Sequence, residues 1–387
     1  MRFLATVAKG LEQVVAEELR SLGLEVLEQS PGLVAFKGRR EDAWRANLHL
    51  RAARRVLLPL GTFEASDAEA LYEGAKSLPW GDYLTPRHTF AVEASVRDSA
   101  FTHSGFVALK VKDAVADVLR QKAGARPDVD RRDPDVGIVV HVEGRKCTVS
   151  LDTSGGPLHK RGYRVASVQA PLNETLAAGI LLLAGYDGGT AFADPFCGSG
   201  TFLIEAALIA TRTPPGLIRK KPFGFERWPG FKPRAWKAML EETRSGTKEP
   251  AHPIVGSDGD ARAIGAALSN AKAAGMDRSI EARRADLRTF QPPSQRGLIA
   301  TNPPYGDHSG EGEGLTALYR ELGDVFKQRC AGWTACVLTG NPALVKSIGL
   351  RPRRRIPLYN GPTECRLLVF ELYEGTRKGT GEKDASR

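Results

Sequence analysis

Apolar residues follow two different periodicities in the two parts of the chain. Up to about residue 152, runs in which apolar and polar residues alternate, such as 89–96, surround helical patterns such as 106–119. From about residue 190, short apolar strands alternate with helices. The first pattern predicts small α+β modules with antiparallel or mixed sheets, and the second predicts a mostly parallel α/β sheet.

Turn residues divide these patterns into segments. A hairpin around Ser30-Pro31-Gly32 belongs to a first module, and Gly155-Gly156-Pro157 breaks the chain after the last strand of a second module. The residues from about 375 onward are polar and predict disorder. We therefore expect a first module at 1–60, a second at 61–152, a linker at 153–170, an α/β domain at 171–374 and a disordered tail at 375–387.

A glycine-rich turn follows the first predicted strand of the α/β domain. Between that strand (190–193) and a helical pattern from Leu203, the chain reads Asp194-Pro195-Phe196-Cys197-Gly198-Ser199-Gly200-Thr201. The two glycines let backbone N–H groups approach a ligand, since glycine has no Cβ, and the hydroxyls can cap the helix. By itself the turn fits a dinucleotide site, a methyl-donor site or a plain tight turn.

Acidic residues stand at the ends of three consecutive predicted strands. Asp194 ends the first, where it can accept hydrogen bonds from a ligand, and Asp258 ends the second at 253–258. A carboxylate in the position of Asp258 can accept both ribose hydroxyls of a nucleoside-bearing cofactor. Asp286 at the tip of the third strand (280–287) can accept from an adenine amino group. Asp260 is expected to cap the helix that follows.

The fourth strand (298–300) runs into Asn302-Pro303-Pro304-Tyr305. An exocyclic amine on a nucleobase is a poor nucleophile, because its lone pair is delocalised into the ring. The Asn302 side-chain carbonyl and the Pro303 backbone carbonyl can accept its two N–H groups and favour tetrahedral nitrogen. Pro303 and Pro304 fix the backbone direction, and Tyr305 can stack on an extruded base. A simple proline turn would explain only the prolines.

Composition narrows the class of protein. Lys plus Arg number 55 against 45 Asp plus Glu, and this net charge of +10 favours a polyanionic partner such as nucleic acid. No apolar run approaches the length of a membrane span. The five cysteines have no C-x-x-C spacing, so we expect no metal site, no disulfide framework and a reduced, cytoplasmic protein. Nothing indicates an oligomer.

The second module resembles a THUMP domain, which occurs in RNA-modifying enzymes. The resemblance rests on the run Phe101-Thr102-His103-Ser104-Gly105-Phe106 and its continuation to Ala114, followed by Pro127-Asp128-Val129-Asp130. The first module resembles the ferredoxin-like domain that precedes THUMP in such enzymes. This pair of domains implies recognition of folded RNA, and the candidate RNA contacts are Lys110, Lys112, Arg126, Arg131, Arg132, Arg161, Lys220 and Lys221. Alternatively, some of these cations pair only with neighbouring aspartates.

The α/β domain resembles the class I S-adenosylmethionine methyltransferases that act on exocyclic amino nitrogens. The residues that carry this resemblance are Asp-Pro-Phe-Cys-Gly-Ser-Gly-Thr from 194 and Asn-Pro-Pro-Tyr from 302. Together with the preceding domains, the chain is similar to bacterial 23S rRNA guanine-N2 methyltransferases. Some of those carry a second methyltransferase domain, whereas this chain ends without one, so the resemblance implies the guanine-N2 activity alone. The fold it implies is a Rossmann-like, mostly parallel seven-stranded sheet.

The resemblance also implies a cofactor, S-adenosylmethionine, and a set of site residues. Catalysis by direct in-line transfer to a flipped guanine falls to Asn302, Pro303, Pro304 and Tyr305, and Cys197 is not a nucleophile. The loop at 310–314 could close over the base. The expected cofactor contacts are Pro171, Asn173, Asp194, Pro195, Cys197, Gly198, Gly200, Thr201, Asp258, Asp286, Leu287 and Asn302.

Several alternatives stay open. Capping of the helix that begins near Leu176 is an equally weighted expectation for Asn173. A tRNA substrate could replace ribosomal RNA. A non-catalytic RNA-binding ribosome-assembly factor would leave both motifs inert, and a nicotinamide-dependent oxidoreductase would leave Asn302 and its neighbours unused. In the insertion at about 213–253, aromatic residues interleaved with basic ones suit either RNA stacking or packing, and we expect most of these rings to pack.

Overall fold

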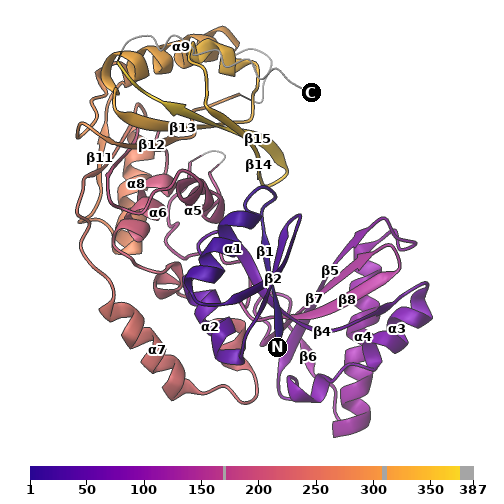
Figure 1. The fold of residues 1–387 in the computed structure, drawn as a ribbon. Coiled ribbons are helices and arrows are strands. Elements are labelled where there is room, and N and C mark those ends of the chain that lie inside the picture. Colours follow the sequence, from indigo (N-terminus) through magenta and orange to yellow (C-terminus); the bar gives the residue numbers. More distant parts are fainter. Residues whose placement is uncertain (169–170, 307–311, 375–387) are drawn as a thin grey trace, which may run out of the picture.

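The computed structural model describes residues 1–168, 171–306 and 312–374, so the tail at 375–387 lies outside the described residues. Two sheets organise the described residues (Figure 1). The first is eight-stranded in the order β2-β3-β1-β4-β8-β7-β5-β6, and the second is seven-stranded in the order β11-β10-β9-β12-β13-β15-β14. No helix in the described part of the chain is long and apolar enough to cross a membrane.

The first sheet is built from two α+β modules. The elements of the N-terminal module are β1 (Arg2–Val7), α1 (Glu12–Ser21), β2 (Glu25–Ser30), β3 (Leu33–Lys37), α2 (Arg40–His49) and β4 (Ala53–Glu64). Those of the second module are α3 (Ala68–Lys76), β5 (Thr89–Arg97), α4 (Ser104–Ala123), β6 (Asp128–Val129), β7 (Val136–Glu143) and β8 (Lys146–Asp152).

Strand β4 joins the two modules. Its first half pairs antiparallel with β1. Its second half pairs antiparallel with β8, from Leu57 opposite Asp152 to Glu64 opposite Lys146. A register shift between Pro59 and Gly61 marks a bulge within the pairing with β8. The expected boundary at residue 60 therefore falls inside one strand, because both modules hydrogen-bond to it in a continuous sheet.

The second sheet confirms the predicted Rossmann-like, mostly parallel architecture. Strands β10, β9, β12 and β13 pair in parallel, and β11 pairs parallel to β10. The hairpin β14–β15 adds two antiparallel strands beside β13, with β14 at the edge. The elements are α5 (Glu174–Leu183), β9 (Ala191–Asp194), α6 (Thr201–Ala210), α7 (Pro233–Ser245), β10 (Ile254–Asp258), α8 (Ala261–Ala274), β11 (Glu281–Arg284), β12 (Gly297–Thr301), α9 (Gly312–Arg329), β13 (Trp333–Thr339), β14 (Arg354–Asn360) and β15 (Thr363–Glu371).

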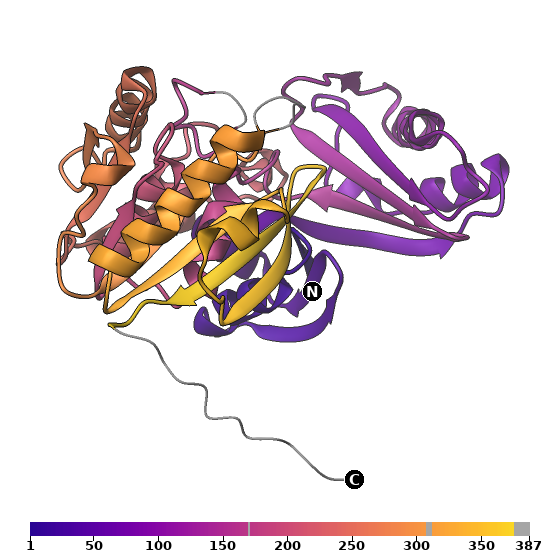
Figure 2. The same cartoon turned by 90° about the horizontal axis from the view of Figure 1, so that it is seen from above.

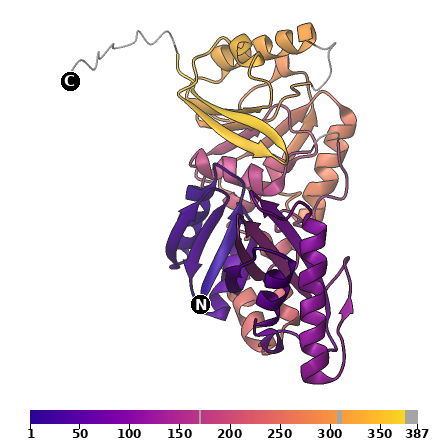
Figure 3. The ribbon, with the colours of Figure 1, turned by 90° about the vertical axis from the view of Figure 1, so that its right-hand side faces the viewer.

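Each face of this sheet is covered. Helix α9 lies across one face (Figure 2), where Tyr319 and Phe326 pack with Ile299 and Trp333. Helices α5, α6 and α8 cover the other face, and their apolar residues form one core with those of the N-terminal module. Helix α5 and the N-terminal module approach each other closely, because a Cβ on Gly179 of α5 would lie 2.4 Å from Cδ1 of Leu11. The N-terminal module is accordingly seated directly on the α/β domain (Figure 3).

Buried polar groups reinforce this junction. Arg161 is only 2% exposed and faces Glu205 of α6, which is fully buried; the two guanidinium–carboxylate contacts measure 3.3 and 3.4 Å. Tyr163 donates to the same carboxylate, and Arg161 also donates to the backbone carbonyl of Arg51. The RNA contact expected of Arg161 is therefore wrong, because its charge is neutralised inside the protein.

The insertion packs by its aromatic residues, as expected. Phe225 stacks on Trp44 of α2 with ring centroids 5.4 Å apart, and Trp236 meets Phe225 edge-on at 5.1 Å. Trp228 meets Tyr83 of the second module edge-on. The insertion thus contacts both N-terminal modules, and its rings are largely withdrawn from solvent.

We expect Arg161→Met to destabilise the protein, because the substitution leaves the buried Glu205 carboxyl without its cation. Loss of one member of a buried pair costs about 3–5 kcal/mol, which lowers the melting temperature by about 5 °C or more. Scanning calorimetry measures this. The control, Arg2→Met, breaks the exposed Arg2–Glu28 pair, and its effect should stay under about 1 kcal/mol. Equal melting temperatures for the two variants would contradict the structural role of Arg161.

Candidate functional site

The site lies where the order of the parallel strands reverses. From β9 the chain passes through α6 to β10 on one side, whereas from β12 it passes through α9 to β13 on the other side. A crevice opens at the carboxyl ends of two such neighbouring strands, because the connections leave in opposite directions. The structure brings the glycine turn after β9 and the Asn302 segment after β12 to this one crevice.

The glycine turn is fastened to the end of β10. The Gly198 N–H donates to the Asp258 carboxylate at 3.0 Å, and the Cys197 N–H donates to the carbonyl of Ser257. Gly198 and Gly200 have φ angles of +51° and +83°, which favour glycine. A Cβ on Gly200 would also lie 3.0 Å from the Cβ of Ala267 in α8. The turn therefore needs glycine both for its backbone and for helix packing.

Asp194 and Asp258 have different surroundings. Asp194 is buried and accepts hydrogen bonds from the Phe196 N–H (3.0 Å) and the Thr301 hydroxyl (2.6 Å). Burial, with the like charge of Asp258 adding to it, raises the pKa of Asp194 to about 7. Asp258 is partly exposed and accepts from the N–H groups of Gly198 and Asp260. Asp258 is the carboxylate of this pair that solvent can reach.

The Asn302 side chain is one of six in the described part of the chain that have a buried polar atom without a hydrogen-bond partner. Its Oδ1 atom is buried and accepts no hydrogen bond from any described residue. A buried acceptor without a partner is costly, so such atoms commonly mark places where a ligand completes the pairing. Pro303 beside it is buried, whereas Pro304 is exposed. The structure thus leaves one amide oxygen at the end of β12 ready to accept an N–H group.

Tyr305 is held at the end of β13. A Cβ on Gly340 would lie 2.8 Å from the Tyr305 ring, so the ring covers this glycine. The Tyr305 carbonyl accepts from the Asn341 side chain. Of the loop at 310–314, residues 310 and 311 lie outside the described residues, and 312–314 already belong to α9.

The remaining expected cofactor residues differ in exposure and in their local hydrogen bonds. Asn173 caps α5, because its side chain accepts from the N–H groups of Thr175 and Leu176. This agrees with the capping alternative. Pro171 is exposed. Asp286 is also exposed, and its side chain accepts a hydrogen bond from the Arg288 N–H. Leu287, between these two residues, is buried. Burial raises the pKa of the Cys197 thiol, so that thiol stays protonated and is a poor nucleophile.

Sequence reasoning missed Arg164. Its guanidinium donates to Glu174 (2.9 Å) and to the hydroxyls of Ser199 and Thr201 (3.2 Å each). It also donates to the carbonyl of Leu172 (2.8 Å). Arg164 therefore connects the linker, the start of α5 and the glycine turn. The two hydroxyls do not cap α6, since the cap residue is Gly200 and no side chain bonds there.

Asn270 of α8 is a second residue that sequence reasoning missed. It is fully buried and donates to the carbonyls of Ala166 and Ser199, while its oxygen accepts from the N–H groups of Val165 and Ala166. Asn270 of α8 therefore connects the linker to the glycine turn, in addition to Arg164. Its partners lie at least 71 residues away along the sequence, so no local spacing could have indicated this role.

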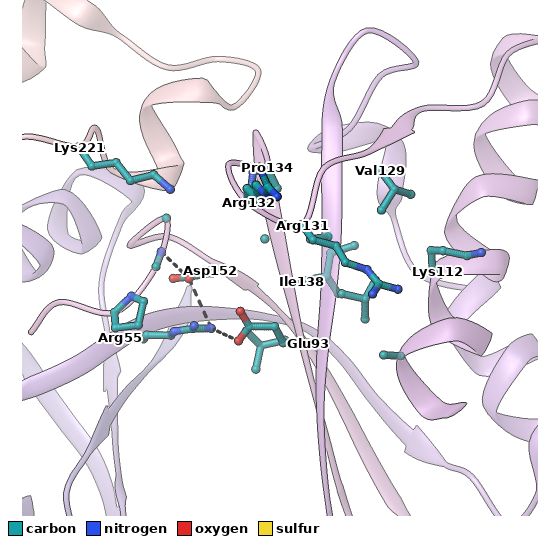
Figure 4. Close-up of a pocket in the computed structure, with 18 of the residues that line it drawn as sticks. Arg55, Glu93, Lys112, Val129, Arg131, Arg132, Pro134, Ile138, Asp152 and Lys221 are labelled. Carbon is teal, nitrogen blue, oxygen red and sulfur yellow. Dashed lines mark hydrogen bonds and ion pairs between the residues drawn. The ribbon is translucent and has the colours of Figure 1, made fainter. Parts of the chain in front are cut away.

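A basic cleft of about 640 Å³ lies between the second module and the linker (Figure 4). It unites four of the expected RNA contacts, Lys112, Arg131, Arg132 and Lys221, with three further cations, Arg55, Lys160 and Arg219. Apolar Leu109 and Val129 line the cleft from the second module and are largely exposed.

Aspartates engage some of the expected RNA contacts, as the alternative reading allows. Lys112 pairs with Asp113 at 2.7 Å, and Lys221 pairs with Asp133 at 2.7 Å, which ties the insertion to the second module. Four of the expected contacts lie outside the cleft lining: the buried Arg161, and Lys110, Lys220 and Arg126, of which Arg126 pairs with Asp117. In the described part of the chain no group of three or more His, Cys, Asp or Glu could hold a metal ion.

Three family models match the chain. The RMKL-like methyltransferase domain matches residues 161–368, the THUMP domain matches 65–152, and the RlmL ferredoxin-like domain matches 2–57. The first of these covers more than half of the chain.

Named relatives are similar over nearly the whole chain. "Ribosomal RNA large subunit methyltransferase K/L" of Syntrophotalea carbinolica is 43% identical over 386 residues, which are 97% of this chain and 54% of that protein. "Putative RNA methyltransferase slr0064" of Synechocystis is 41% identical over 96% of this chain and 97% of that protein. The chain therefore spans about half the length of the K/L relatives that it matches.

Solved structures share the fold. "SMU.472, a putative methyltransferase complexed with SAH" has a TM-score of 0.87 and 31% identity, with 97% of this chain and 99% of that chain covered. TrmN from Thermus thermophilus has a TM-score of 0.69 and 27% identity, with 96% and 99% covered.

We expect Arg164→Met to weaken binding of S-adenosylhomocysteine about 10-fold, because the glycine turn loses two hydrogen bonds from a charged group. Isothermal titration calorimetry measures the dissociation constant. The control, Arg97→Met, removes an exposed guanidinium on β5 and should leave that constant unchanged. A variant at Arg164 that binds as tightly as the control would show that the linker does not hold the turn.

Proposed function

The chain belongs to the RMKL-like, S-adenosylmethionine-dependent methyltransferase family with a THUMP domain, and we propose that it methylates the N2 amine of a guanine in 23S ribosomal RNA. The observation that carries the proposal is the buried, unpartnered Oδ1 of Asn302 beside the glycine turn. The resemblance to the K/L methyltransferases of ribosomal RNA supports the substrate. Family membership excludes the nicotinamide-dependent oxidoreductase alternative.

The site fits the donor by its chemistry. Asp258 and Asp286 present carboxylates at the tips of neighbouring strands, and the turn from Cys197 to Gly200 offers backbone close to the crevice. We propose that these residues hold the donor, with Leu287, Pro171, Asn173 and the other expected contacts around them. When bound, S-adenosylmethionine supplies an electrophilic methyl group.

The residues after β12 prepare the acceptor. Asn302 Oδ1 accepts one N–H of the target amine and the Pro303 carbonyl accepts the other, which localises the lone pair on nitrogen. The donor, held by the glycine turn and Asp258, would supply its methyl group to that lone pair; the sulfur would keep the electrons of its bond to the methyl group, and the nitrogen would release one proton to water. Positioning and electrostatics lower the barrier here, so no strong base is required. Pro304 fixes the turn, and Tyr305 supports the extruded base.

The basic cleft is the proposed RNA-binding surface. Seven cations from β4, the second module, the linker and the insertion line it. Arg55 of β4 already pairs with Glu93 and Asp152, and the others suit a chain of phosphates. Lys112, Arg131, Arg132 and Lys221 are the expected contacts that remain in this role, with Lys110, Arg126 and Lys220 at its margins. Phosphate contacts of this kind position an RNA without reading its sequence.

Two alternatives are separated by experiment. A transfer RNA would use the same crevice, so the substrate must be tested directly. A non-catalytic assembly factor has no need for a buried amide oxygen without a partner, and the Asn302 side chain therefore favours the enzyme.

We expect Asn302→Ala to lower methyl transfer at least about 100-fold, since the amine loses one of its two acceptors. Labelled donor is incubated with unmodified 23S ribosomal RNA and, separately, with transfer RNA, and the nucleosides are analysed. N2-methylguanosine should form in 23S RNA with the parent protein only. A melting temperature and a circular dichroism spectrum close to those of the parent control for folding. Parental activity in the variant would refute the mechanism, and product in transfer RNA alone would refute the substrate.

We expect Arg131→Glu to weaken RNA binding about 10-fold. The slope of the logarithm of the binding constant against the logarithm of the salt concentration should become shallower by roughly one, the contribution of one phosphate contact. The matched control, Arg145→Glu, makes the same charge change at the far β7–β8 turn, outside the cleft lining. Filter binding at several salt concentrations measures both. If the two variants weaken RNA binding equally, the cleft is not the RNA surface.

A further inference from the structure

The tips of β9 and β12 are joined by side chains beyond the point where their backbones stop pairing. Backbone pairs between the two strands are Gly297 with Ala191, Leu298 with Phe192 and Ile299 with Ala193. Past that last pair, the Thr301 hydroxyl donates to the Asp194 carboxylate at 2.6 Å. This hydrogen bond therefore joins the carboxyl ends of the two strands.

We propose that the Thr301–Asp194 hydrogen bond sets the spacing between the donor and acceptor halves of the site, which makes Thr301 a positioning residue. The inference rests on the proposed function. Each end of the bond leads directly into one half. Asp194 Oδ1 also accepts from the Phe196 N–H at the start of the glycine turn. Thr301 is covalently followed by Asn302, whose oxygen receives the amine.

One carboxylate oxygen thus holds both halves. It binds the first backbone N–H of the turn and the last side chain of β12 at the same time. Asp194 and Thr301 are 1% and 0% exposed, so water does not compete for the bond. Because methyl transfer requires sub-ångström alignment of two bound groups, a change in this spacing reduces the rate more than it reduces donor affinity.

The charge state of Asp194 controls the strength of this link. An ionised carboxylate accepts hydrogen bonds more strongly than a neutral one. In the described structure, burial is the main cause that raises the pKa of Asp194; the donors Thr301 and Phe196 lower it, and the like charge of Asp258 on β10 adds a smaller increase. Cys197 on the following turn faces Asp194 as well and stays neutral because burial raises the pKa of its thiol. The link is accordingly weakened as the pH falls below about 7.

Thr301→Val tests the proposal, because valine has nearly the shape of threonine and lacks the hydroxyl. Removal of a donor to the charged form raises the pKa of Asp194 by about one unit. The acidic limb of the pH–rate profile should shift upward with it. The kcat of methyl transfer should fall about 10- to 100-fold, while the dissociation constant of S-adenosylhomocysteine stays within about threefold. Thr301→Ser keeps the hydroxyl and should restore both the rate and the profile.

A direct titration makes the test independent of activity. The Asp194 carboxyl is followed by NMR with 13C-labelled aspartate, and Asp194→Asn assigns its signal. The matched control is Thr211→Val, which removes another buried hydroxyl at the end of α6 and should change neither the titration nor the rate.

Three outcomes would overturn the inference: an unchanged Asp194 pKa in Thr301→Val, an unchanged kcat in that variant, or equal impairment in Thr301→Ser. Failure of the proposed function looks different. The parent protein would then transfer no methyl group to any RNA, while the carboxyl titration would still report whether Thr301 holds Asp194.

Discussion

Divergence of the chain at the ends of β9 and β12 is the constraint on which the site depends. Two neighbouring parallel strands whose connections run to opposite sides cannot both be covered at their tips, so a crevice must open between them. The glycine turn enters this crevice from β9, and the Asn302 segment enters it from β12. A donor and an acceptor can then meet above strands that a packed sheet holds rigidly, which is the requirement of a reaction that depends on positioning.

The same crevice explains why polar groups are buried nearby. Asp194, Arg164 and Asn270 each bridge segments that would otherwise separate at the sheet edge. Buried polar groups stabilise a structure only when nearly all of them are paired. Within this network the Asn302 oxygen is a group without a partner in the described structure. That contrast favours a role in ligand binding over a role in folding.

The N-terminal modules are part of the same rigid construction. Arg161 and Glu205 neutralise each other in the junction, and the aromatic rings of the insertion pack on α2. Lys221 and Arg227 of the insertion pair with Asp133 in the second module. Such contacts fix the basic cleft relative to the crevice. An RNA held in the cleft would therefore present its target base at a defined distance from the donor.

The sequence alone determined the elements and motifs whose signals are local. Strand and helix periodicity, the spacing in the glycine turn and the Asn302 segment depend on neighbouring residues, so the sheet architecture and the two motif positions were predictable. Only the tertiary structure decided which charges reach the surface and which are paired inside the protein. Arg161 and Arg164 lie in the same short run and look alike in sequence. However, Arg161 pairs with Glu205, whereas Arg164 donates to Ser199 of the glycine turn. Their partners lie 35 to 44 residues away, and those of Thr301 lie 107 away. Long-range pairing of this kind arises from packing of whole elements, and no local pattern encodes it.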